Sequence, residues 1–277
     1  MQRKNGRRKK IAYVLCGILA VVLFSGCQST AADGTDEKVF VYGDTTFNAE
    51  NDESDVNPHN GYSGWACIRY GIGETLFHYS DSMKIEPWLA ESYTVNDEHT
   101  EWVVTLKKGL KFSDGCDLTA SKVKEAYEHL KEVGPSGSAK PEKYLEFEAT
   151  ITADDAANTL TIQTTQPYAN LPGQLAHPTM AIVDVADTEN FDNGTIGTGP
   201  YKYVSRSPQE NVILEKFDEY WGTPANIDTV KLQVIANADT IVTSLNGGSV
   251  DMFARISQAQ ADQLSDDFDV LEGTMNL

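Results

Sequence analysis

Five histidines are the side chains best suited to acid–base or metal chemistry in this sequence. Their positions, 59, 78, 99, 129 and 177, do not follow the spacing of a metal-binding motif. His177 is still a candidate metal ligand, because neutral imidazole is the commonest one; the alternative is a hydrogen-bonded loop histidine. G-x-S-x-G, HExxH and P-loop motifs are missing, and Gly71-Ile72-Gly73-Glu74-Thr75-Leu76 lacks the third glycine of a dinucleotide loop. We therefore expect a binding protein rather than an enzyme.

Four cysteines offer sulfur chemistry, at positions 16, 27, 67 and 116. None of them forms a CxxC pair, which argues against a structural zinc site. A disulfide between Cys67 and Cys116 is possible outside the cell. We expect two free, buried thiols instead, because buried cysteine behaves as a small hydrophobic residue.

The first 26 residues have the parts of a secretory signal peptide. Six basic residues lie among the first ten, an apolar run extends from Ile11 to Phe24, and Ser25-Gly26 precedes Cys27. The apolar run is shorter than the roughly 20 residues of a membrane-spanning helix. The stretch resembles the lipobox of bacterial lipoproteins, with Phe24 where leucine is usual. That resemblance implies cleavage before Cys27 and a diacylglyceryl group on its sulfur; the alternative is a plain signal or anchor.

The mature chain is strongly acidic. The whole sequence has a formal charge of −19, and removal of residues 1–26 takes away six basic residues and no acidic ones, which leaves −25. Such a surface argues against nucleic acid and against anionic membranes as partners. Residues 27–37 are small, polar and acidic, which is typical of a flexible tether after a lipidated N-terminus.

Helical and strand patterns interleave along the mature chain, which is typical of a mixed α/β fold. A helix is predicted from Thr119, its N-cap, to about Lys131. Its apolar stripe consists of Val123, Ala126, Tyr127 and Leu130. Further helices are expected from Gly64 onward and over 239–246. Strands are expected at 39–42, 101–106, 159–164, 201–204, 212–216, 230–235 and 250–253.

Short motifs in a fixed order carry a family resemblance. They are Pro87-Trp88-Leu89-Ala90-Glu91-Ser92-Tyr93, Lys111-Phe112-Ser113-Asp114-Gly115, Gly197-Thr198-Gly199-Pro200-Tyr201-Lys202, Tyr220-Trp221-Gly222 and Asn246-Gly247-Gly248-Ser249-Val250-Asp251. In order and spacing they resemble the extracellular solute-binding proteins of family 5, the peptide- and nickel-type binding proteins of ABC transporters. Their chemistry is structural: glycines allow tight turns and close backbone approach, and Tyr220-Trp221 supplies apolar area.

The resemblance implies where a ligand would bind. In this family the loop after the first strand borders the cleft, and here it reads Asn57-Pro58-His59-Asn60-Gly61-Tyr62. The residues expected at the ligand are Tyr62, Trp65, Tyr144 and His177, with packing inside the fold as their alternative role. His177 stands where nickel-type relatives have an arginine, so the chain departs from the nickel type there.

The resemblance also implies a periplasmic-binding-protein-like α/β fold of class II type. Residues 38–75 and 177–277 are expected to form the main subdomain of lobe I, with 76–176 as an inserted subdomain. Family members are nearly twice as long, and lobe II has no counterpart in this sequence. We therefore expect a fragment that alone binds weakly or not at all, because closure around a ligand needs two lobes.

The expected function is that of a substrate-binding lipoprotein of an ABC importer. It would capture a short peptide or a nickel or other metal chelate outside the membrane and deliver it to the permease and ATPase subunits. No cofactor and no catalytic residue is expected. The alternatives are a surface sensor or adhesin that reuses the binding fold, and a secreted hydrolase.

Overall fold

The computed structural model describes residues 37–45, 56–59, 65–133, 148–186, 194–207, 210–235 and 237–271. Cys27, Tyr62 and Tyr144 lie outside these ranges, as does the signal peptide expected at 1–26. The described residues belong to one compact unit that begins at Glu37. Within them, no helix is both long enough and apolar enough to span a membrane.

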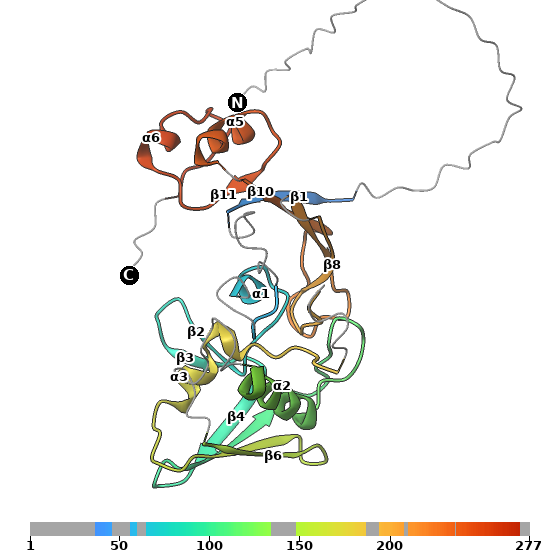
Figure 1. Cartoon of the computed structure of the whole chain (residues 1–277), viewed down its shortest axis with the longest axis vertical. Coiled ribbons are helices and arrows are strands. Elements are labelled where there is room, and N and C mark those ends of the chain that lie inside the picture. Colours follow the sequence, from blue (N-terminus) through green and yellow to red (C-terminus); the bar gives the residue numbers. More distant parts are fainter. Residues whose placement is uncertain are drawn as a thin grey trace, which may run out of the picture. The chain divides into compact units, whose positions relative to one another are not determined.

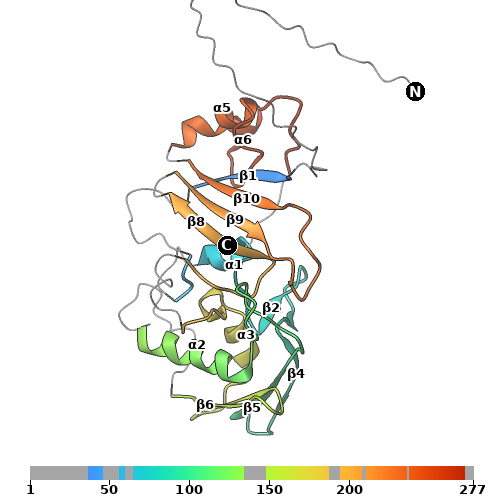
Figure 2. The same ribbon diagram turned by 90° about the vertical axis from the view of Figure 1, so that its right-hand side faces the viewer.

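The first sheet joins the start of the described chain to its last third (Figures 1 and 2). Its order is β11-β1-β10-β9-β8, with β1 Val39–Asp44, β8 Tyr201–Ser207, β9 Asn211–Lys216, β10 Thr229–Val234 and β11 Met252–Phe253. β1 lies between β10 and β11 and is parallel to both, whereas β8, β9 and β10 pair antiparallel. The strands expected here are confirmed, although the one expected at 250–253 is reduced to β11.

A second sheet is built from the middle of the chain. Its order is β4-β5-β7-β6, all antiparallel, with β4 Ala90–Val95, β5 Glu101–Leu106, β6 Thr150–Asp154 and β7 Thr159–Gln163. In β5 every second side chain is buried, namely Trp102, Val104 and Leu106, as the pleat requires. A separate hairpin pairs β2 Phe77–Tyr79 with β3 Ile85–Pro87.

Helix α2, Ala120–Val133, packs against β6 and β7 of the second sheet (Figure 1). The predicted stripe is confirmed, because Val123, Ala126, Tyr127 and Leu130 are all buried. At its start the Thr119 Oγ1 accepts a hydrogen bond from the Lys122 N–H at 3.3 Å, as a capping residue does. The sequence therefore specifies both the start of this helix and its buried face.

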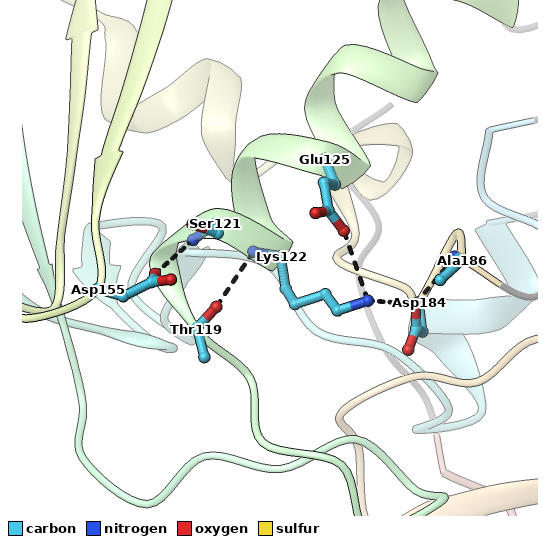
Figure 3. A network of polar contacts seen from close by, with 7 residues as sticks. All are labelled: Thr119, Ser121, Lys122, Glu125, Asp155, Asp184 and Ala186. Atoms are coloured by element: carbon cyan, nitrogen blue, oxygen red, sulfur yellow. Dashed lines mark hydrogen bonds and ion pairs between the residues drawn. The ribbon is translucent and has the colours of Figure 1, made fainter.

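Polar contacts fix the first turn of α2 to two other segments (Figure 3). The Ser121 N–H donates to Asp155 Oδ1 at 2.8 Å, and this hydrogen bond lowers the pKa of the Asp155 carboxyl. The Lys122 ammonium lies 3.3 Å from Asp184 and 3.4 Å from Glu125. An acidic group at a helix N-terminus is also favoured by the helix dipole.

The other helices are short. They are α1 Ala66–Arg69, α3 Leu171–Leu175, α5 Ile241–Asn246, α6 Gln258–Ala261, and the 3₁₀ turns η3 Pro178–Met180 and η4 Ala238–Thr240. The helix expected from Gly64 is reduced to α1, which ends before Gly71. Gly71 has φ +70°, a left-handed conformation that glycine adopts readily and that ends helices.

Three hydrophobic clusters stabilise these elements. The largest lies between the second sheet, α2 and α3, and contains Trp102, Phe112 and Tyr127. The two smaller clusters lie on opposite faces of the first sheet, since Tyr42 of β1 packs against one and Val41 against the other.

One expectation about the cysteines is wrong. Cys67 is a buried free thiol as expected, but Cys116 is free and exposed. It lies in the turn around Gly115, where the Cys116 N–H donates to the Asp114 carboxylate at 2.9 Å. The Asp114 side chain also raises the pKa of the Cys116 thiol, first by a hydrogen bond and then by its charge.

Candidate functional site

Trp65 and His177, two of the four predicted ligand residues, are in direct contact. Their rings meet edge to face, with centroids 4.9 Å apart and planes at 86°. Trp65 is the residue that precedes α1, and His177 is the residue that precedes η3, so two separate chain turns bring them together. The fold therefore places an indole and an imidazole side by side, 112 residues apart in sequence.

Burial and hydrogen bonding together define the charge of His177 and the position of its ring proton. Its Nδ1 accepts a hydrogen bond from the Thr179 N–H at 3.3 Å and also contacts the Thr179 hydroxyl. Burial lowers the pKa of the imidazole to about 4, so the ring is neutral at neutral pH. A backbone N–H can only donate, so Nδ1 carries the lone pair and the ring proton is on Nε2.

This tautomer decides what the ring can do. Nε2 carries an N–H, which donates hydrogen bonds and has no lone pair for a metal ion. Metal binding through Nε2 would require the proton to move to Nδ1 and the contact with the Thr179 N–H to be lost. The geometry therefore favours His177 as a hydrogen-bond donor to an oxygen atom over His177 as a metal ligand.

In the part of the chain that the structure describes, no three or more His, Cys, Asp or Glu side chains are placed to hold one ion. Tyr62 and Tyr144 lie outside that part, so their role at the ligand stays a prediction.

Another polar residue, the buried carboxylate Glu74, was not predicted as a special residue. It accepts hydrogen bonds from the Tyr220 hydroxyl at 2.6 Å, the Trp221 Nε1–H at 2.9 Å and the Thr198 hydroxyl at 3.0 Å. Burial raises the pKa of Glu74, and these three donors oppose that shift. The Lys107 ammonium lies 4.1 Å from the centroid of the Trp221 ring. The hydrogen bonds of one carboxylate thus link three segments of the chain.

The glycines of the Gly197-Thr198-Gly199 motif have the structural role expected of them. A Cβ atom on Gly197 would lie 2.1 Å from the Ile72 carbonyl oxygen, and one on Gly199 would lie 2.2 Å from that of Gly71. The Gly199 N–H donates to the Ile72 carbonyl at 2.9 Å. The motif therefore holds this backbone directly against the segment that leads to Glu74.

This mixed α/β arrangement is that of the periplasmic binding proteins. The structure is similar to the crystal structure of a nickel ABC transporter protein from Bacillus halodurans, with a TM-score of 0.71 and 26% identity over 82% of this chain and 45% of that chain. Residues 84–274 match the family model of the bacterial extracellular solute-binding proteins, family 5 Middle. The chain belongs to this family, and the expected family and fold class are confirmed.

Two curated relatives show the range of ligands among similar proteins. The nickel-binding protein NikA of Staphylococcus aureus (strain NCTC 8325 / PS 47) is 28% identical over 238 residues, 86% of this chain and 44% of the relative. The glutathione-binding protein GsiB of Escherichia coli (strain K12) is 30% identical over 194 residues, 67% of this chain and 37% of the relative. The chain thus spans less than half the length of these relatives.

Proposed function

We propose that this chain forms part of the ligand-capturing component of an ABC importer. The observation that carries the proposal is its membership of a family of extracellular solute-binding proteins, with relatives named for nickel and for glutathione. The component binds a short peptide or a metal chelate outside the membrane and presents it to the permease and ATPase subunits. It performs no chemistry on its ligand.

The ligand face that we propose contains Trp65 and His177, together with Tyr62 and Tyr144. An indole and an imidazole in edge-to-face contact supply a rigid apolar wall with a polar donor beside it, which is the usual make-up of a small-molecule site. With its proton on Nε2, His177 donates to a carboxylate or carbonyl oxygen. Both ligand classes have such oxygens. A peptide has them in its terminal carboxylate and its backbone carbonyls, and a chelate has them in its organic part.

Anchoring through lipid at Cys27 is a second part of the proposal, supported by the Ser25-Gly26-Cys27 context. Two acyl chains on one residue give stable membrane attachment, whereas a single chain is marginal. Mass spectrometry of the mature N-terminus tests this. We expect Cys27 as first residue with a diacylglyceryl mass, and Cys27→Ala should release the protein from the membrane fraction. An unmodified Cys27 would show that the signal is of the plain type.

Binding is best tested in a chimera, because the relatives are about twice as long as this chain. The chain replaces the corresponding segment of the Staphylococcus aureus nickel-binding protein, and calorimetry measures binding of nickel–histidine complexes and of mixed di- to pentapeptides. We expect saturable binding of one class, weakened roughly tenfold by His177→Ala through loss of one hydrogen bond.

Two controls complete this test. His99→Asn changes an exposed histidine outside the proposed ligand face and should leave affinity unchanged. The unmodified Staphylococcus aureus protein is measured in the same way, so that the chimera is compared with a functional binding protein. If neither ligand class binds, the proposed ligands are wrong; if His177→Ala binds like the unchanged chimera, His177 is only a loop residue.

A further inference from the structure

Two histidines to which the proposed function assigns no role lie with their ring nitrogens against each other. His59 Nδ1 and His129 Nδ1 are 3.1 Å apart, and the ring centroids are 5.3 Å apart. His59 follows the Asn57-Pro58 turn and is fully buried, whereas His129 is on α2 and partly exposed. The two rings come from positions 70 residues apart.

The separation of the two nitrogens fits a shared metal ion. Zn–N bonds are about 2.0–2.1 Å long, so two imidazole nitrogens on one tetrahedral ion are ~3.3 Å apart, and ~2.9 Å apart at a right angle. The observed 3.1 Å lies between these two values. Imidazole suits Zn²⁺, Ni²⁺ and Cu²⁺, and it suits Mg²⁺ and Ca²⁺ poorly.

The surroundings of the pair also suit a cation. Burial lowers the pKa of His59 to about 3 and lowers that of His129, so both rings are neutral at neutral pH and keep a lone pair for an ion. The carboxylate of Glu132 acts on His129 and supplies negative charge nearby. The His59 ring also interacts with the Ala181 backbone, and metal-binding histidines are commonly oriented by such a backbone contact.

We propose that His59 and His129 bind one divalent late transition-metal ion through their Nδ1 atoms, with water or other small ligands in the remaining positions. Neither Trp65 nor His177 is a ligand of this ion. Without metal, one Nδ1–H donates to the other Nδ1. On binding, that proton moves to Nε2 of the same ring, both Nδ1 lone pairs coordinate the ion, and the pair releases no net proton.

Calorimetry on the purified whole chain, made without a histidine tag, tests this with Zn²⁺ and with Ni²⁺. We expect one saturable site for each ion, weakened at least tenfold by His129→Ala. His129→Asn separates the two roles of the pair, because the Asn amide can donate to His59 Nδ1 as a ring N–H does but is a poor ligand for these ions. It should keep the thermal stability of the metal-free protein and lose the site.

Three variants serve as controls. His99→Asn and His177→Ala should bind metal as the unchanged chain does, and Cys116→Ser should exclude the exposed thiol as a ligand. X-ray absorption of the zinc form should show two imidazole nitrogens at about 2.0–2.1 Å. Absence of saturable binding, or unchanged binding by His129→Asn, would overturn the proposal. Loss of binding in His177→Ala alone would place the ion at the ligand face instead.

Discussion

His177 shows how one hydrogen bond sets the chemistry of a residue. The Thr179 N–H occupies Nδ1, so the ring offers an N–H rather than a lone pair at Nε2. The sequence identifies the histidine but not its hydrogen bond with Thr179. The preference of His177 for a donor role could therefore not be predicted from the sequence.

The pKa of His177 predicts a pH dependence. Its folded value of about 4 lies below the unfolded value of about 6.5, so the unfolded state binds the proton more readily. The stability contributed by the neutral ring is complete above pH 6.5 and is lost as the pH falls from 6.5 towards 4. Comparing the urea midpoints of the unchanged chain and His177→Gln at pH 7 and pH 5 measures this, and the difference between them should shrink at pH 5.

An NMR titration provides an independent check of the same residue. The His177 ring signal should move with a midpoint near pH 4, well below the ordinary histidine value of about 6.5. A midpoint near 6.5 for His177 would contradict the buried, neutral ring.

Glu74 predicts a stability effect that sequence alone would not suggest. Glu74→Ala leaves the Trp221 N–H and the Tyr220 and Thr198 hydroxyls without their acceptor, which costs about 1–3 kcal/mol for each buried donor that stays unsatisfied. Urea unfolding should show this loss, whereas Glu98→Ala, at an exposed turn, should change stability by less than about 0.5 kcal/mol. Equal effects would mean that water replaces the carboxylate.

At the scale of elements, the close approach of Gly199 to Gly71 gives a sharp prediction. Gly199→Ala puts a Cβ atom 2.2 Å from a backbone oxygen, and backbone cannot move away as a side chain can. We expect a loss of about 3 kcal/mol or more in unfolding free energy, the upper end of overpacking effects. Gly248→Asn is the control, because nothing lies within 4 Å there and its φ of +69° is in the left-handed region that Asn adopts more readily than other residues. Similar midpoints for both variants would refute the argument.

The elements that could be predicted are those with a strong pattern. α2, β5 and β7 have buried side chains at regular spacing, and the structure has them within two residues of the expected bounds. β4 was not predicted, because only Ala90 at its start is buried and its next four residues are exposed. The β2–β3 hairpin has three residues in each strand, too few for a periodic signal.

The candidate site was predictable only in part, for a related reason. Family motifs pointed to Trp65 and His177, but their contact depends on two turns that no local pattern specifies. Glu74 stands between the apolar residues Ile72 and Leu76, which hints at burial, yet its three donors lie 124 to 147 residues away. Long-range partners of this kind are set by the tertiary fold.

At the scale of the whole molecule, the subdomain boundaries stay a proposal: residues 38–75 and 177–277 in one subdomain of lobe I, and 76–176 in the other. The two sheets give this proposal a test by native-state hydrogen exchange. We expect the amides of β5 and β7 to share one opening free energy and those of β9 and β10 to share another. A single common value for all four strands would show that they open as one cooperative unit.

The central position of β1 has a consequence for how the chain acquires its fold. Val39 pairs with Thr229, and the Lys38 N–H donates to an Asp228 carboxylate 190 residues later. The first strand of the described chain is therefore completed only by partners from its last third, and such high contact order makes folding slow. Until those partners arrive, the two edges of β1 are open to pairing with other strands.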